Sequence, residues 1–184
     1  AEINAWWVSC QKIGVIPVIG AYSLGKAQRV LAMLDTNLGP ILTHGAVENT
    51  NEVMRKQGVQ LPATHRVEGR TLDPDLRNGI VICPPSAMRS AWVKKFRPYK
   101  TAMASGWMAS RGNRRRRNVD RGFIISDHAD WGGLLSAVKA SGAEEVLTTH
   151  GYSHVFARYL SEEMGLRSRE LQTEYGVEED AEAE

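Results

Sequence analysis

Two histidines, each at the end of a short apolar run, are the residues of this 184-residue chain best suited to chemistry. His128 follows Phe123-Ile124-Ile125, and His150 follows Val146-Leu147. The stretch between the two runs has helical spacing, so the pattern predicts strand, helix and strand, with a histidine at the carboxyl end of each strand. Ligands in open α/β sheets gather at that edge, where imidazole serves as a metal ligand or as an acid or base. A polar turn residue that caps a helix is the structural alternative.

Two acidic residues flank His128. A carboxylate beside a functional imidazole orients the ring and raises its basicity, and either Asp127 or Asp130 is placed to do so. Asp130 is equally well placed to cap the helix that follows, through the backbone N–H of Gly133. The candidate catalytic residues are therefore His128, Asp127 and Asp130.

A second candidate site lies at the turn Tyr22-Ser23-Leu24-Gly25-Lys26, between an apolar run and a helical pattern. Backbone N–H groups at the start of a helix attract anions, and a nearby lysine adds a positive charge. Only the Gly-Lys pair matches the phosphate-binding word G-x-x-x-x-G-K-S/T, so nucleotide hydrolysis is not supported. A tight turn with a solvated lysine remains the alternative.

The formal net charge of +2 conceals a strong asymmetry. Between Ser86 and Arg121 there are eleven Lys or Arg residues and one acid, Asp120. The densest part holds Arg111, Arg114, Arg115, Arg116 and Arg117, whose planar guanidinium groups suit two-point contacts with phosphate oxygens. We expect some of these arginines to contact nucleic acid, although a solvated charged turn would have the same composition. Residues 174–184 carry six acids and no base, which predicts a disordered tail.

The order of apolar runs and helical patterns predicts an α/β fold with a mostly parallel sheet and helices on both faces. The expected strands are residues 15–20, 41–43, 80–83 and 101–105, and the expected helices are residues 25–34 and 48–57. Ser86 is predicted to cap a further helix that continues through Trp92 and Phe96. Residues 64–78 lack periodicity and are predicted to form a surface loop.

Composition indicates a soluble globular protein. The chain is 42% hydrophobic but has no apolar stretch near the roughly 20 residues that a membrane helix needs. Its first residues lack the basic flank and apolar centre of a signal peptide. Cys10 and Cys83 are predicted to be buried and reduced, which fits a cytoplasmic location, and Trp6, Trp7 and Trp92 are predicted to belong to the core.

Five short sequence motifs, called words below, occur in the order found in the β-CASP branch of the metallo-β-lactamase-fold nucleases. The resemblance is strongest to the bacterial ligase-associated DNA exonucleases. The resemblance extends from about residue 4 to about residue 173. It implies a β-CASP cap domain over residues 1–115, the C-terminal portion of the metallo-β-lactamase domain over 116–173, and the acidic tail over 174–184. The matching words begin at Tyr22, Pro84, Ser105 and Arg111, and the fifth comprises Gly122 to Trp131 followed by Thr149-His150-Gly151.

The main metal-binding word of this fold, His-x-His-x-Asp-His, does not occur in the chain, where His44, His65 and His154 stand alone. We therefore expect the chain to be the C-terminal part of a larger enzyme whose N-terminal segment supplies that word. The resemblance implies two divalent metal ions, Zn or Mn, in the larger enzyme and none on this part alone. It also implies that His150 completes the coordination of one metal, that His128 acts on the scissile phosphate, and that Lys26 and Gln28 contact the nucleic-acid backbone.

Three functions follow from these features. The first is a DNA exonuclease in DNA repair, with DNA as substrate and a DNA ligase or helicase as an implied partner. The second is an RNA-processing nuclease of the mRNA 3′-end-processing type, since β-CASP enzymes divide between DNA and RNA. The third is a basic nucleic-acid-binding module without catalysis.

Overall fold

The structure is a computed structural model that describes residues 2–109 and 118–171. The chain divides into two compact units, Ala1–His128 (unit 1) and Ala129–Glu184 (unit 2). The predicted domain boundary after residue 115 and the acidic tail both lie outside the described residues. No helix of the described part is long and apolar enough to cross a membrane.

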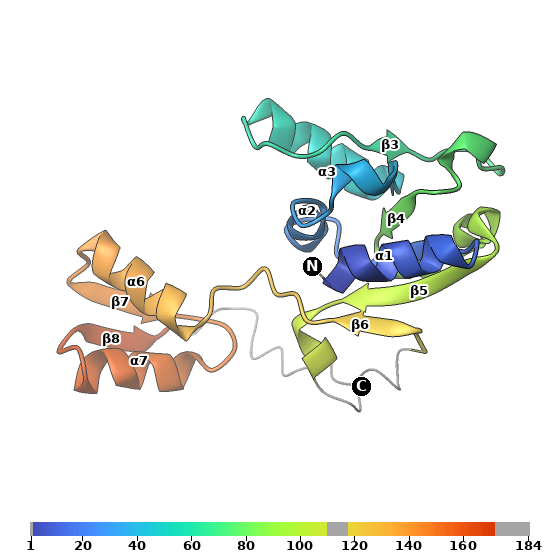
Figure 1. Ribbon diagram of the computed structural model, residues 1–184. Helices are drawn as coiled ribbons and strands as arrows, with labels where there is room; N and C mark the ends of the chain where they lie inside the picture. Colours follow the sequence, from blue (N-terminus) through green and yellow to red (C-terminus); the bar gives the residue numbers. More distant parts are fainter. Residues whose placement is uncertain (1, 110–117, 172–184) are drawn as a thin grey trace. The chain divides into compact units, whose positions relative to one another are not determined.

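Unit 1 is built on a six-stranded sheet in the order β3-β2-β4-β1-β5-β6, and every neighbouring pair is parallel (Figure 1). This arrangement confirms the predicted α/β class. The strands are β1 (Ile16–Gly20), β2 (Ile41–Thr43), β3 (His65–Arg66), β4 (Ile80–Cys83), β5 (Tyr99–Ala104) and β6 (Arg121–Phe123). The strands expected over residues 15–20, 41–43, 80–83 and 101–105 correspond to β1, β2, β4 and β5, and the strand expected over residues 123–125 corresponds to β6, which ends two residues earlier, at Phe123.

Apolar clusters cover both faces of this sheet, as a parallel sheet requires. Side chains alternate along β1, so that Val18 joins one cluster and Ile19 joins the other. The Ile19 cluster takes residues from α1 (Glu2–Lys12), α2 (Lys26–Leu31) and α3 (Gly45–Lys56), and the Val18 cluster takes them from α4 (Pro85–Met88) and the 3-10 helix η3 (Ala91–Phe96). Trp6 and Trp7 on α1 are buried, and so are the free cysteines Cys10 and Cys83, as predicted.

Several boundaries differ from the predictions. Helix α3 begins three residues earlier than predicted, because His44 Nδ1 accepts a hydrogen bond from the backbone N–H of Ala46 and caps it. The predicted cap at Ser86 is wrong. Proline suits the first helical position, so α4 begins at Pro85 and ends at Met88. A separate cap at Ser90, which accepts from the backbone N–H of Trp92, then begins η3.

The predicted loop over residues 64–78 is mostly irregular, but it contains β3 and the 3-10 helix η2 (Pro74–Leu76). Two further 3-10 helices, η1 (Thr36–Leu38) and η4 (Gly106–Ala109), complete the described helices of unit 1. The expected helix over residues 25–34 is shorter, since α2 ends at Leu31.

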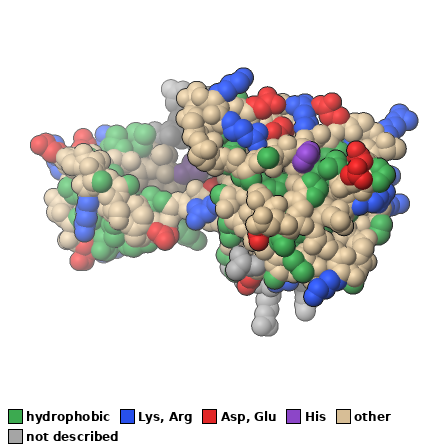
Figure 2. Space-filling model, turned by 45° about the horizontal axis from the view of Figure 1, so that its top comes forward, with side chains coloured by type: hydrophobic (Ala, Val, Ile, Leu, Met, Phe, Trp, Pro, Cys, Tyr) green, Lys and Arg blue, Asp and Glu red, His purple; other side chains and the backbone are tan. Residues whose placement is uncertain are grey.

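Unit 2 consists of α6 (Trp131–Ser141), β7 (Glu145–Thr148), α7 (Ser153–Glu162) and β8 (Arg167–Glu170), with the two strands paired in parallel. The predicted helix between the histidine words and the strand before His150 are both present. No residue of α6 is buried, and hydrophobic side chains lie on the surface of unit 2 (Figure 2). Trp131 packs edge-on against Phe156 and Tyr159, with ring centroids 5.2 and 4.9 Å apart.

Candidate functional site

The carboxyl ends of three neighbouring strands place three of the sequence words together in unit 1. β1, β5 and β6 are adjacent and parallel, so the segments that follow them leave the sheet at one edge. A methyl group added at Gly106, after β5, would lie 3.7 Å from Ser126 Cβ, after β6. Lys26 Nζ, after β1, lies 3.2 Å from Asp127 Oδ1. Segments remote in sequence therefore meet at the edge where α/β proteins bind ligands.

The turn between β1 and α2 requires glycine at position 25. Gly25 has φ +80°, which side chains of L-residues rarely adopt. A methyl group there would also lie 2.7 Å from Asp127 Oδ2, closer than the atoms' contact distance. The Asp127 carboxylate thus occupies the space that the missing Cβ leaves.

Lys26 is 8% exposed, and its charge already has partners within the protein. Besides Asp127, its ammonium group lies 4.8 Å from the centre of the Tyr22 ring. Burial would raise the pKa of Asp127, but the hydrogen bonds from Lys26 and from the backbone, together with the nearby positive charge, hold that pKa below its ordinary value. The Asp127 carboxylate is therefore ionised at neutral pH.

His128 projects into solvent from the same edge, with its side chain 82% exposed. Its backbone N–H donates to Ser126 Oγ over 3.2 Å. Its Nε2 lies 3.9 Å from Asp127 Oδ1, which is beyond hydrogen-bond distance. Asp127 is thus bonded to Lys26 in this structure, and the orienting bond to the imidazole stays a prediction.

Asp130 caps α6, since its Oδ1 accepts from the backbone N–H of Gly133 over 2.8 Å. This is the structural alternative that the sequence offered for Asp130. One carboxylate oxygen is committed to the helix, and the catalytic role predicted for this residue remains untested.

His150 lies in unit 2, in the turn between β7 and α7. It is exposed and has φ +75°, an uncommon conformation for a residue other than glycine. Its strand, β7, pairs with β8, whereas the strand before His128 pairs with β5. The two histidines thus follow strands of separate sheets. Among the described residues no group of three or more His, Cys, Asp or Glu side chains could hold a metal ion.

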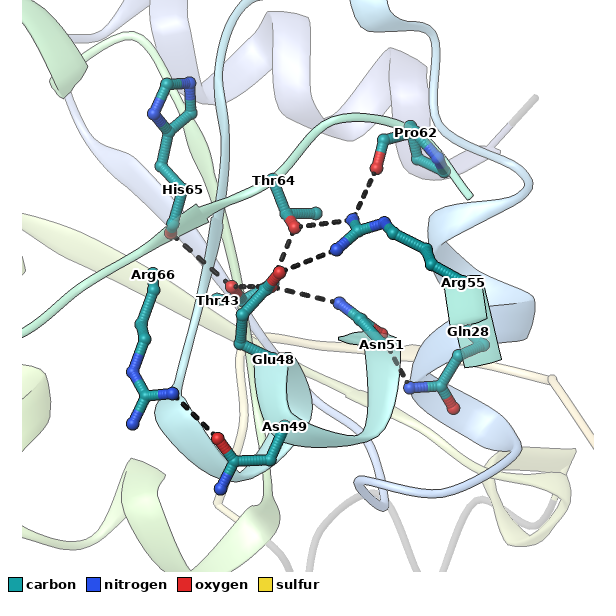
Figure 3. A network of polar contacts seen from close by, with 10 residues as sticks. All are labelled: Gln28, Thr43, Glu48, Asn49, Asn51, Arg55, Pro62, Thr64, His65 and Arg66. Atoms are coloured by element: carbon teal, nitrogen blue, oxygen red, sulfur yellow. Dashed lines mark hydrogen bonds and ion pairs between the residues drawn. The ribbon is translucent and has the colours of Figure 1, made fainter. Parts of the chain in front are cut away.

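Gln28, predicted to contact a phosphate, is buried on α2 (Figure 3). Its Nε2 donates to the backbone oxygen of Ser23 over 2.9 Å and to Asn51 Oδ1 over 2.8 Å. Its Oε1 is buried and has no hydrogen-bond partner among the described residues. A phosphate oxygen is itself an acceptor, so this free oxygen does not suit a phosphate. The geometry instead connects Gln28 with the turn that carries Lys26.

Gln28 is connected through Asn51 to a buried carboxylate that the sequence did not reveal. This carboxylate is Glu48 on α3 (Figure 3). The hydroxyl groups of Thr43 and Thr64 each donate to its Oε2 over 2.7 Å, and Arg55 Nη1 donates to Oε1 over 2.7 Å. Asn51 Nδ2 also donates to Oε2, which continues the network to Gln28. Burial would raise the pKa of Glu48, but these bonds together lower it to about 2. Glu48 belongs to a segment that reads as a polar helix, where no local pattern marks it as buried.

The structure describes the basic stretch of residues 86–121 only in part. Arg111 and Arg114 to Arg117 lie outside the described residues. Asp120, the one acid of this stretch, accepts from the backbone N–H and the hydroxyl of Thr101 on β5.

Trp107 is 54% exposed at the edge described above, whereas Trp131 packs within unit 2.

Comparison with known proteins gives one informative relative. No family model matches the chain. The chain is 35% identical over 147 residues to a protein of Opitutus terrae named "Probable DNA ligase". The match covers 80% of this chain but 14% of that protein, so the chain spans about one-seventh of its relative's length.

Proposed function

We propose that the chain is part of a β-CASP nuclease that hydrolyses phosphodiester bonds of DNA in DNA repair. The observation that carries this proposal is the convergence of three of the family's words at one sheet edge, with an exposed imidazole beside them. The relative named a probable DNA ligase supports DNA rather than RNA as the substrate. It is also in keeping with a DNA ligase as partner, or as part of the same polypeptide.

His128 is the residue of this chain that we assign to the chemical step. An imidazole with 82% exposure can approach a phosphate and donate a proton or a hydrogen bond to the leaving oxygen. Its backbone is held by Ser126, and Asp127 directly precedes it. The arginine run that precedes β6 in the sequence, Arg111 and Arg114 to Arg117, is proposed to bind the nucleic-acid backbone.

The described residues do not fit a metal site by themselves. A catalytic zinc ion takes about three ligands from the protein, and these residues include no cluster of three suitable side chains. In the proposal, His150 contributes one ligand, and a segment with the His-x-His-x-Asp-His word supplies the others for two Zn or Mn ions.

The test uses a longer form of the protein that includes such a segment. We expect metal-dependent cleavage of DNA, with His128→Ala slowing it about 10²–10⁴-fold at unchanged metal content. His150→Ala should lower both metal content and rate. His154→Ala, at another exposed histidine, is the matched control and should leave both unchanged. Cleavage that His128→Ala does not slow would contradict the assignment.

A non-catalytic nucleic-acid-binding module is the second candidate, favoured by the lack of a three-donor cluster in the described part of the chain. The two candidates share salt-dependent binding, to which each neutralised phosphate adds about 0.9 to the slope for duplex DNA. Replacing Arg114 to Arg117 by Ala should therefore weaken binding and flatten that slope.

Parallel assays with DNA and RNA of one sequence distinguish the DNA nuclease from an RNA-processing enzyme.

A further inference from the structure

We propose that the ion pair between Lys26 and Asp127, called the latch below, positions the segment that carries His128. Gly25 leaves the space that the Asp127 carboxylate fills. Lys26 then acts through Asp127 and does not contact a phosphate itself. The use of His128 in catalysis rests on the proposed function, but the latch is a property of unit 1 and is testable without it.

The first support for the latch is the burial of Lys26. An ammonium group removed from water is costly unless a charge or hydrogen-bond acceptor compensates it. The Lys26 side chain is 10% exposed, and Asp127 Oδ1 at 3.2 Å supplies that compensation. The Tyr22 ring covers the same ammonium group. A phosphate that binds the Lys26 ammonium group would have to displace Asp127 or bind beside it.

The second support is the fit between Gly25 and Asp127. A methyl group at Gly25 would collide with Asp127 Oδ2 at 2.7 Å. Gly58 offers a contrast, because it has a similar φ of +86° but nothing within 4 Å of an added methyl group. Backbone conformation alone therefore explains glycine at position 58, whereas position 25 also needs room for the carboxylate.

The third support is that one side of the latch is fixed. Gln28 holds the backbone of Ser23 within the turn and is itself joined through Asn51 to Glu48. The other side has less support: Ile125 is the last buried residue of unit 1, and Ser126 to His128 lie outside any helix or strand. Asp127 is the point at which this segment is attached to the turn.

The consequence concerns the imidazole directly. Because Asp127 precedes His128 in the chain, fixing its side chain restricts the backbone from which His128 projects. A nearly fixed starting position matters for a proton donor, since small misplacements of a catalytic group reduce rate strongly. Lys26, Asp127 and Gly25 are thus positioning residues for His128.

The experiment measures backbone order parameters of residues 126–128 by ¹⁵N NMR relaxation in the 184-residue chain. They should fall from about 0.85 to below about 0.6 in Lys26→Met and in Asp127→Asn, with no further fall in the double variant. Lys26→Arg should restore most of the order. Gly25→Ala should loosen the same residues, and its matched control Gly58→Ala should not. Unchanged amide signals from β1 and β4 verify that each variant is folded.

DNA binding separates the latch from a phosphate contact. With a latch, Lys26→Met leaves the salt slope of DNA binding unchanged. With a phosphate contact, Lys26→Met reduces that slope by about 0.9 and Asp127→Asn tightens binding, because a competing carboxylate is lost. The latch is overturned if the order parameters stay high in both single variants or if the slope falls. Loosening of residues 126–128 in a protein that proves not to be a nuclease would sustain the latch and refute only the proposed function.

Discussion

Unit 1 and unit 2 both alternate strands with helices, yet they differ in how much of their apolar surface they bury. In unit 1 the strands β1, β2 and β4 are buried along their whole length, between clusters on both faces of the sheet. In unit 2 the sheet has two strands, and Leu134 on α6 and Leu147 on β7 are exposed. Burial of apolar surface is the main term that favours folding. Unit 1 therefore should be the more stable of the two.

The same difference separates the two histidines. His128 follows a segment attached by Ile125 in the core and by Asp127, which is paired with Lys26. His150 lies in an exposed turn between β7 and α7, with both its own φ and that of Gly151 positive. A site residue can thus be supported by a buried core or by local backbone geometry alone, and the two kinds of support should respond differently to mutation.

The largest effect should come from the buried network of unit 1. Glu48→Leu removes the carboxylate that accepts from Arg55, Thr43 and Thr64, and removing one partner of a buried ion pair costs about 3–5 kcal/mol. Arg55 keeps 32% exposure, which favours the lower end of that range. Chemical denaturation followed by unit-specific NMR signals should show the loss in unit 1, while unit 2 is unaffected.

The matched control is Glu52→Leu, because Glu52 is exposed on the same helix. It should change the free energy of unfolding of unit 1 by no more than about 0.5 kcal/mol. Equal losses in the two variants would show that the network adds nothing beyond a surface charge. A loss in both units after Glu48→Leu would show that they unfold together.

Low pH should weaken unit 1 through the same carboxylate. The pKa of Glu48 is lowered from 4.5 to about 2 in the folded state. A depressed carboxyl pKa contributes stability that is present above the unfolded value and is lost as pH falls from about 4.5 to about 2. The loss should be about 3 kcal/mol, at 1.36 kcal/mol for each pKa unit. Denaturation midpoints measured across this range should flatten in Glu48→Gln, and an equally steep profile in that variant would exclude Glu48 as the cause.

Local pattern was sufficient for the sheet but not for this network. Runs such as Ile80-Val81-Ile82-Cys83 have no polar alternation, which is typical of a strand buried on both faces, and β4 has these bounds. Glu48, by contrast, is buried where Thr43 and Thr64 approach it from outside α3 and Arg55 reaches it from two turns further along the same helix. Such convergence depends on tertiary structure, so the sequence assigned Glu48 to an ordinary polar helix.

The site shows the same limit. The sequence placed Lys26 and His128 at the carboxyl ends of their strands, since an apolar run and a turn are local signals. It could not show that the Asp127 carboxylate lies nearer to the Lys26 ammonium group than to the His128 imidazole. That distance depends on the order of β1, β5 and β6 in the sheet. For Gln28 the resemblance implies a phosphate contact, which stays a prediction, and local pattern could not show that its amide Nε2 donates to Asn51.

The smallest of these effects concerns unit 2 and the aromatic contacts of Trp131. Trp131 is 43% exposed but meets Phe156 and Tyr159 edge-on, and each such pair contributes about 0.5–1.5 kcal/mol beyond the buried area. Trp131→Ala should therefore lower the free energy of unfolding of unit 2 by about 2 kcal/mol. Because unit 2 buries little else, this loss should be large enough to unfold it measurably at moderate temperature, as followed by amide signals of α7. Trp107→Ala provides the control in unit 1, where an indole with 54% exposure should contribute less than about 0.5 kcal/mol. If the two substitutions cost the same, exposure rather than aromatic packing governs both residues, and the contrast between the units loses its physical basis.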